Sequence, residues 1–190
     1  DALPILDNHN FKLPQPLLNI INGGKHSNSG LDLQEFMIAP IGFNSFSKKI
    51  DASRAVITSL KKILEGKKYS TDLGDEGGFA PVLSSNEEAI ELIEQAIIGA
   101  GYSLDEIKIG IDAAASSFYK DGYYHLKILG KLEKLDSDGL IKWYCDLVKK
   151  HPILFIEDPL SENDWEGFAK ITEKLGEKIK IVVKIRQPFQ

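Results

Sequence analysis

The spacing of apolar residues changes along the first half of the chain, and it predicts two strands followed by two helices. Short apolar runs predict strands at residues 16–21 and 31–38. Over residues 46–64 the apolar positions recur every three or four residues, which is typical of an amphipathic helix of about five turns. Ser85 has the spacing of a helix-capping residue, and it predicts a second helix that ends near Gly99.

Strands and helices alternate in the second half of the chain. Apolar runs predict strands at residues 107–111, 153–156 and 178–183. The helices between them are predicted to be capped by Ser137 and Asn163. This alternation is typical of βαβ units and a parallel sheet. The whole pattern therefore predicts an α/β fold with about five strands.

Composition and length restrict the class of protein. With 43% hydrophobic residues, the 190-residue chain can bury a sizeable core, and its length alone suggests one domain. The net charge of −5 argues against a surface for nucleic acid or anionic lipid. The single cysteine, Cys145, excludes an internal disulfide framework and a cysteine-based metal site. No apolar run is long enough for a membrane span and no secretory pattern is visible, so a cytoplasmic protein is expected.

Two carboxylates occupy equivalent positions at the ends of predicted strands. Asp112 directly follows the strand at 107–111, and Glu157 directly follows the strand at 153–156. Because the carboxyl ends of parallel strands meet at one edge of a sheet or barrel, these acids are expected to lie together. Oxygen ligands of this kind suit a hard cation. Each acid could instead cap the turn that follows it.

Other polar residues give weaker signals. Gln34 and Glu35 fall within a predicted strand, where a buried charge needs a partner or a metal. Glu76 stands before two glycines in a polar stretch, where the backbone can approach a ligand and a carboxyl can serve as a general acid. A solvated turn explains that stretch equally well. His26 follows a glycine turn, and a surface or hydrogen-bonding role is the ordinary explanation for it.

Several motifs, taken together, resemble the enolase family. The longest are NIINGGKH at 19–26, LQEFMIAP at 33–40 and GDEGGFAP at 74–81. Shorter matches continue the series at 85–89, 118–122, 156–159 and 164–167. The motifs come in the family's order and spacing over about residues 12–183, so the set is far more specific than any one of its parts.

The resemblance implies a fold and a reaction. The family dehydrates 2-phosphoglycerate to phosphoenolpyruvate in glycolysis, with Mg²⁺, in a TIM barrel that begins ββαα and continues in βα units. Since such a barrel takes about 250 residues, this chain resembles part of one. The resemblance divides the chain into a lead-in at 1–11, a partial barrel domain at 12–183 and a divergent tail at 184–190. A homodimer is expected from the family.

The resemblance also implies roles for single residues. Glu76 resembles the general acid that protonates the departing hydroxyl, and Glu35 resembles its partner in that step. The positions that resemble substrate contacts are His26, Gln34, Glu35 and Glu157. Asp112 and Glu157 resemble two of the three carboxylate ligands of Mg²⁺.

The chain departs from the family after its last predicted strand. The family has two consecutive aspartates there, the second of which is the third metal ligand, whereas this chain has Lys184 and Ile185. Neither residue offers an oxygen ligand, so a weaker Mg²⁺ site is expected. The segments that carry the family's lysine base and its phosphate-binding residues have no counterpart in this sequence. The 190-residue chain alone is therefore predicted to be inactive.

Three interpretations follow. The chain is a piece of an enolase, with residues 184–190 altered by a frameshift, a splice variant or an assembly error. Alternatively, it is a non-catalytic enolase remnant that acts, if at all, through binding. A different barrel metalloenzyme on the same scaffold is disfavoured by the matches at 33–40 and 74–81.

Overall fold

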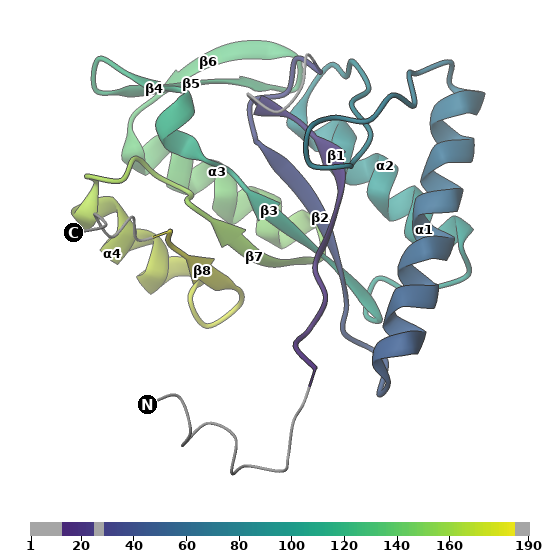
Figure 1. Ribbon diagram of the computed structural model, residues 1–190. Coiled ribbons are helices and arrows are strands. Elements are labelled where there is room, and N and C mark those ends of the chain that lie inside the picture. Colours follow the sequence, from purple (N-terminus) through teal and green to yellow (C-terminus); the bar gives the residue numbers. More distant parts are fainter. Residues whose placement is uncertain (1–12, 25–28, 185–190) are drawn as a thin grey trace, which may run out of the picture.

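The main feature of the fold is one sheet of five strands with helices packed on it (Figure 1). The structure is a computed structural model that describes residues 13–24 and 29–184. Its elements in chain order are β1 (Leu18–Asn22), β2 (Glu35–Pro40), α1 (Phe46–Gly66), α2 (Asn86–Gly99), β3 (Ile107–Asp112), the 3-10 turn η3 (Ala115–Ser117), β4 (Tyr119–Lys120), β5 (Tyr123–Ile128), β6 (Lys131–Leu135), α3 (Ser137–Lys150), β7 (Ile153–Glu157), α4 (Trp165–Leu175) and β8 (Lys180–Val182).

The strands of the main sheet lie in the order β1-β2-β3-β7-β8. The predicted order of two strands, two helices and then alternating elements is confirmed except between β3 and α3, where β4, β5 and β6 intervene. The parallel sheet predicted for the second half of the chain is confirmed for β3, β7 and β8, whereas β1 pairs antiparallel with β2 and β2 pairs antiparallel with β3. In the described residues the sheet is open, with β1 and β8 as its edges.

The hydrophobic core lies between the sheet and its helices. The odd-numbered isoleucines of β3, at 107, 109 and 111, are fully buried, as are Val56 and Leu60 of α1 and Ile90 and Ile93 of α2. Because side chains alternate along a strand, Lys108, Gly110 and Asp112 point to the opposite face. One face of β3 therefore packs on the helices, and the opposite face carries the Asp112 carboxylate at the end of the strand. No helix in the described parts is long and apolar enough to cross a bilayer.

The second strand begins later than predicted. The strand expected at 31–38 is β2 at Glu35–Pro40, so Gln34 precedes it and Glu35 is its first residue. The reason is a buried side chain in α2. The Asn86 Oδ1 atom accepts hydrogen bonds from the backbone N–H groups of Asp32 (3.1 Å) and Leu33 (3.2 Å).

Two helix caps also differ from the predicted ones. The N-cap of α3 is Asp136 in place of Ser137, and its Oδ1 accepts from the N–H of Gly139 at 2.8 Å. The N-cap of α4 is Asp164 in place of Asn163, and it accepts from the N–H of Gly167 at 2.9 Å. In both cases an aspartate stands next to the predicted cap and satisfies an amide of the first turn.

A second, three-stranded antiparallel sheet of β4, β5 and β6 was not predicted. Its two tight turns are Asp121-Gly122 and Leu129-Gly130, and all four residues have positive φ angles between 48° and 83°. Such turns match the right-handed twist of a hairpin. The Asp-Gly pair is a strong hairpin signal, so the sequence did contain this information.

A close approach between strands provides a test of the sheet. Gly110 of β3 lies opposite Phe155 of β7, and an added Cβ would lie 2.1 Å from the Phe155 ring. We expect Gly110→Ala to lower the free energy of unfolding by about 1–3 kcal/mol, because the buried ring has to move. Gly66→Ala is the control, since its Cβ would meet nothing within 4 Å. Urea denaturation measures both, and equal stability of the two variants would contradict the described strand pairing.

Candidate active site

Polar residues lie side by side in a row across the main sheet, at one end of its strands. In the strand pairing, Asn22 of β1 lies opposite Glu35, Glu35 opposite Asp112, Asp112 opposite Glu157, and Glu157 opposite Val182. The row runs along the carboxyl ends of the parallel strands β3, β7 and β8. This is the edge at which α/β proteins assemble their sites.

Asp112 is the most deeply buried acid of this row, with 1% of its side chain exposed. Its Oδ1 atom accepts a hydrogen bond from the N–H of Ala114 at 3.0 Å. Asp112 therefore also caps the turn that follows it, which was the alternative role for this acid. Its Oδ2 atom accepts from Gln34 Nε2 at 3.4 Å and from Lys184 Nζ at 2.5 Å. The carboxylate is thus compensated by two amides and one full positive charge, as a buried ion requires.

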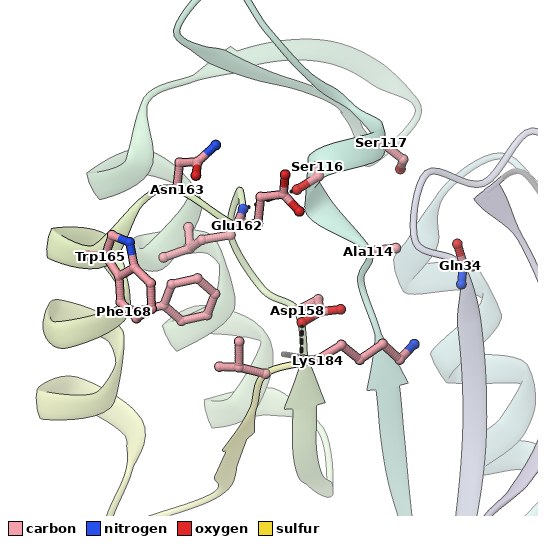
Figure 2. A pocket seen from close by; sticks show the side chains of 12 residues that line it. Gln34, Ala114, Ser116, Ser117, Asp158, Glu162, Asn163, Trp165, Phe168 and Lys184 are labelled. Carbon is pink, nitrogen blue, oxygen red and sulfur yellow. Dashed lines mark hydrogen bonds between the residues drawn. The ribbon is translucent and has the colours of Figure 1, made fainter. Parts of the chain in front are cut away.

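Lys184 contacts both strand-end acids. Its Nζ atom lies 2.5 Å from Asp112 Oδ2 and 3.3 Å from Glu157 Oε1. Figure 2 shows its side chain extending across the strand ends toward Gln34. Burial and the charge of Asp112 raise the pKa of Glu157, which Lys184 partly opposes. Burial disfavours the charged form of Lys184, but its hydrogen bond to Asp112 and the nearby carboxylates raise its pKa.

A pocket of about 690 Å³ lies beside this row (Figure 2). The loops that follow β3, β7 and β8 line it, together with Gln34. Trp165 and Phe168 of α4 form its apolar side, whereas Asp158, Glu162 and Lys184 bring charges to it. The pocket therefore offers a small polar ligand both charged and apolar contacts.

Two residues at the pocket have an unusual backbone. Ala114, two residues after β3, has a φ angle of 43°, and Asp158, directly after β7, has a φ angle of 46°. For alanine this left-handed conformation costs about 1 kcal/mol or more. Hydrogen bonds between the two loops hold it, since the N–H of Ala115 donates to the Asp158 carbonyl at 3.0 Å. Strain of this kind is concentrated at functional sites.

A buried polar network fixes the loop after β7. The Tyr124 hydroxyl accepts from the N–H of Ser161 at 2.9 Å and donates to Asp164 Oδ2 at 3.3 Å, and Ser137 also contacts this oxygen. Burial raises the pKa of Tyr124 to about 12, so the hydroxyl stays protonated. Sequence patterns do not reveal this network, because its members come from three separate segments.

Asn22 organises the glycine-rich loop that carries Glu76. Its backbone N–H donates to the Phe79 carbonyl at 2.8 Å. With its amide oriented so that the oxygen faces the loop, it accepts from the N–H groups of Asp75 (3.3 Å) and Glu76 (3.2 Å). An added Cβ at Gly74 or Gly78 would lie within 3.0 Å of the Asn22 side chain.

The sequence suggested that the glycines near Glu76 let the backbone approach a ligand, but the structure gives two of them another role. Gly74 and Gly78 make room for Asn22, and Gly77 has a φ angle of 79° with nothing within 4 Å of an added Cβ. The close contacts of Gly74 and Gly78 are therefore with the protein itself. Asn22 was missed as a site residue, although it ends a strand in the same way as Asp112 and Glu157 do.

The structure brings together most of the residues singled out from the sequence. Lys184 contacts Asp112 and Glu157, and Gln34 contacts Asp112. Glu35 lies in register with Asp112. Glu76 is exposed on a loop that lies beside β1, the edge strand of the sheet. His26 lies outside the described residues.

The described residues contain no cluster of three or more His, Cys, Asp or Glu side chains that could hold a metal ion. Cys145 is partly buried against the core. Asp112 and Glu157 are the right ligand type for a hard cation, but an ammonium group already contacts both of them.

Comparison with known proteins relates this geometry to a family. Residues 10–184 match the family described as "Enolase, C-terminal TIM barrel domain". The chain belongs to the enolase family. It is 52% identical over 171 residues to the enolase of a Nitratiruptor species, 52% over 172 residues to that of Helicobacter hepaticus and 51% over 172 residues to that of Helicobacter pylori.

Each of these alignments covers 90% of this chain but 40% of the enolase to which it is compared. The open five-stranded sheet agrees with this coverage, because it corresponds to part of the enolase barrel. The resemblance inferred from the motifs and the partial TIM-barrel fold are both confirmed.

The position of Glu76 provides a test of this site. We expect Asn22→Ala to speed hydrogen exchange of the Asp75 and Glu76 amides at least tenfold, because they lose the side chain that accepts from them. Exchange in the core helices should stay unchanged. Ser70→Ala is the control, since its hydroxyl bonds to Asp72 of the same loop. Unchanged protection at Glu76 in the Asn22 variant would contradict the arrangement.

Proposed function

We propose that the protein takes part in the enolase reaction, the elimination of water from 2-phosphoglycerate to give phosphoenolpyruvate in glycolysis. Membership of the enolase family supports this proposal. The observation that carries it is the row of Glu35, Asp112 and Glu157 at one edge of the sheet, beside a pocket of about 690 Å³. The proposed substrate is then a small phosphorylated acid. The protein is proposed to act in the cytoplasm as a homodimer.

In this proposal Glu76 is the general acid and Glu35 is its partner. The reaction removes a proton from the carbon beside a carboxylate and expels hydroxide from the next carbon, so a proton has to be supplied to the leaving group. Two contacts support the pairing. Glu35 lies opposite Asn22 in the sheet, and the Asn22 side chain contacts the backbone of Glu76. Gln34 and His26 are proposed to contact the substrate.

Mg²⁺ is the cofactor that the family implies, and Asp112 and Glu157 are its proposed ligands by resemblance. The described residues do not fit that ion as they stand, because Lys184 contacts both carboxylates. Mg²⁺ requires near-octahedral oxygen coordination, which an ammonium cannot supply. No step of the proposed reaction is therefore assigned to a metal in this chain.

A second candidate function is an enolase-family chain that binds without catalysing. The Lys184 contact favours it, because a cation of the chain itself already contacts the two proposed metal ligands, Asp112 and Glu157. The DNA around codon 184 distinguishes the two candidates. Two aspartate codons in another frame would support the enolase, and an uninterrupted lysine codon in the transcript would support the inactive chain.

We predict that the 190-residue chain alone forms no phosphoenolpyruvate above the rate of a buffer blank. The family's lysine base has no counterpart in this sequence, and loss of a positioned base costs about 10²–10⁴-fold. Absorbance of phosphoenolpyruvate with purified chain, 2-phosphoglycerate and Mg²⁺ measures this, with Helicobacter pylori enolase as the positive control.

Two variants decide what any observed turnover means. Turnover that disappears in Glu76→Gln but persists in Glu91→Gln, an exposed residue of α2, would overturn the prediction of an inactive chain. Turnover that survives both substitutions would instead indicate a contaminating enzyme.

A further inference from the structure

Lys184 reaches the strand ends from the solvent side of the site. Its side chain is 52% exposed, while that of Asp112 is 1% exposed and that of Glu157 is 19% exposed. The flexible stem thus lies partly in water, and its charged end is placed on two carboxylates that are largely shielded from water. Among the residues that the structure describes, Lys184 is the cation that contacts both acids.

The backbone of Lys184 is held in this position. Its N–H donates to Asp158 Oδ1 at 2.8 Å, and the N–H of Asp158 donates to the Val182 carbonyl at 2.9 Å. These two bonds connect the end of β8 to the loop after β7. The placement of the ammonium therefore depends on backbone contacts as well as on its attraction to the acids.

The ammonium and a divalent ion need the same space. An ion that used Asp112 Oδ2 and Glu157 Oε1 would lie about 2.1 Å from each oxygen. The Lys184 nitrogen is already 2.5 Å from the first and 3.3 Å from the second. Two cations at these separations would repel strongly and overlap sterically. Occupation by one excludes the other.

We propose that Lys184 is a built-in cation that replaces a divalent metal ion between Asp112 and Glu157. The chain then holds its strand-end carboxylates together without Mg²⁺, and it keeps Mg²⁺ away from them. This inference rests on the proposed function only for the expectation that Asp112 and Glu157 would hold a divalent ion, and it is tested without an activity assay.

Thermal unfolding in the presence and absence of Mg²⁺ tests the proposal. The wild-type chain and the variants Lys184→Met and Lys180→Met are each melted in 10 mM MgCl₂ and in KCl of equal ionic strength. Methionine keeps the approximate length of the side chain and removes its charge. Lys180 is the matched control, because it is an exposed lysine of β8, the strand that precedes Lys184.

The expected result is a Mg²⁺-dependent rise in Tm for Lys184→Met alone. For a newly opened site with a dissociation constant of about 1 mM, the rise is about 3–6 °C. Wild type and Lys180→Met should give the same Tm in both salts. A wild-type Tm that rises as much as that of Lys184→Met would overturn the proposal, as would a Lys184→Met response no larger than that of Lys180→Met.

A second measurement covers the case in which Lys184→Met is unfolded without divalent ions. Folding of that variant on addition of 10 mM MgCl₂, followed by circular dichroism, supports replacement of a metal by the lysine. Failure to fold in MgCl₂ overturns it. Titration calorimetry of the wild-type chain with MgCl₂ gives an independent readout, and a dissociation constant below about 1 mM would also overturn it.

Discussion

A carboxylate that is almost wholly shielded from water has to be compensated, and Asp112 shows how this chain does so. Two amide groups and one ammonium contact its two oxygens. Removing a charge from water costs several kcal/mol, so the segments that supply these groups are held where the carboxylate requires them. They come from the turn after β3, from Gln34 before β2, and from Lys184 after β8. Three separated parts of the chain thus converge on one side chain.

The register of the sheet makes this requirement more severe. The parallel pairing of β3 with β7 places Glu157 opposite Asp112, so a second acid stands beside the first. Two facing carboxylates of this kind suit a hard cation. Here a single lysine contacts both acids. The same strand ends can therefore be held together by a cation that the chain itself carries.

Features that depend on many residues were predictable, and features that depend on one contact were not. Apolar periodicity located the helices and the strands that end in Asp112 and Glu157, because burial of one face acts along a whole element. The start of β2 depends instead on Asn86, whose side chain binds a backbone 53 residues away. The sequence showed that Lys184 and Ile185 stand where the resemblance implies two aspartates. Its contact with both acids needed the three-dimensional pairing of the strands.

Lys184 and Asp112 interact directly at the strand ends. A double-mutant cycle with Asp112→Asn, Lys184→Met and the double variant measures this interaction from urea denaturation curves. We predict a coupling free energy of about 1–3 kcal/mol, because each single variant leaves the other group without its charged partner. Additive effects of the two substitutions, with a coupling close to zero, would contradict it.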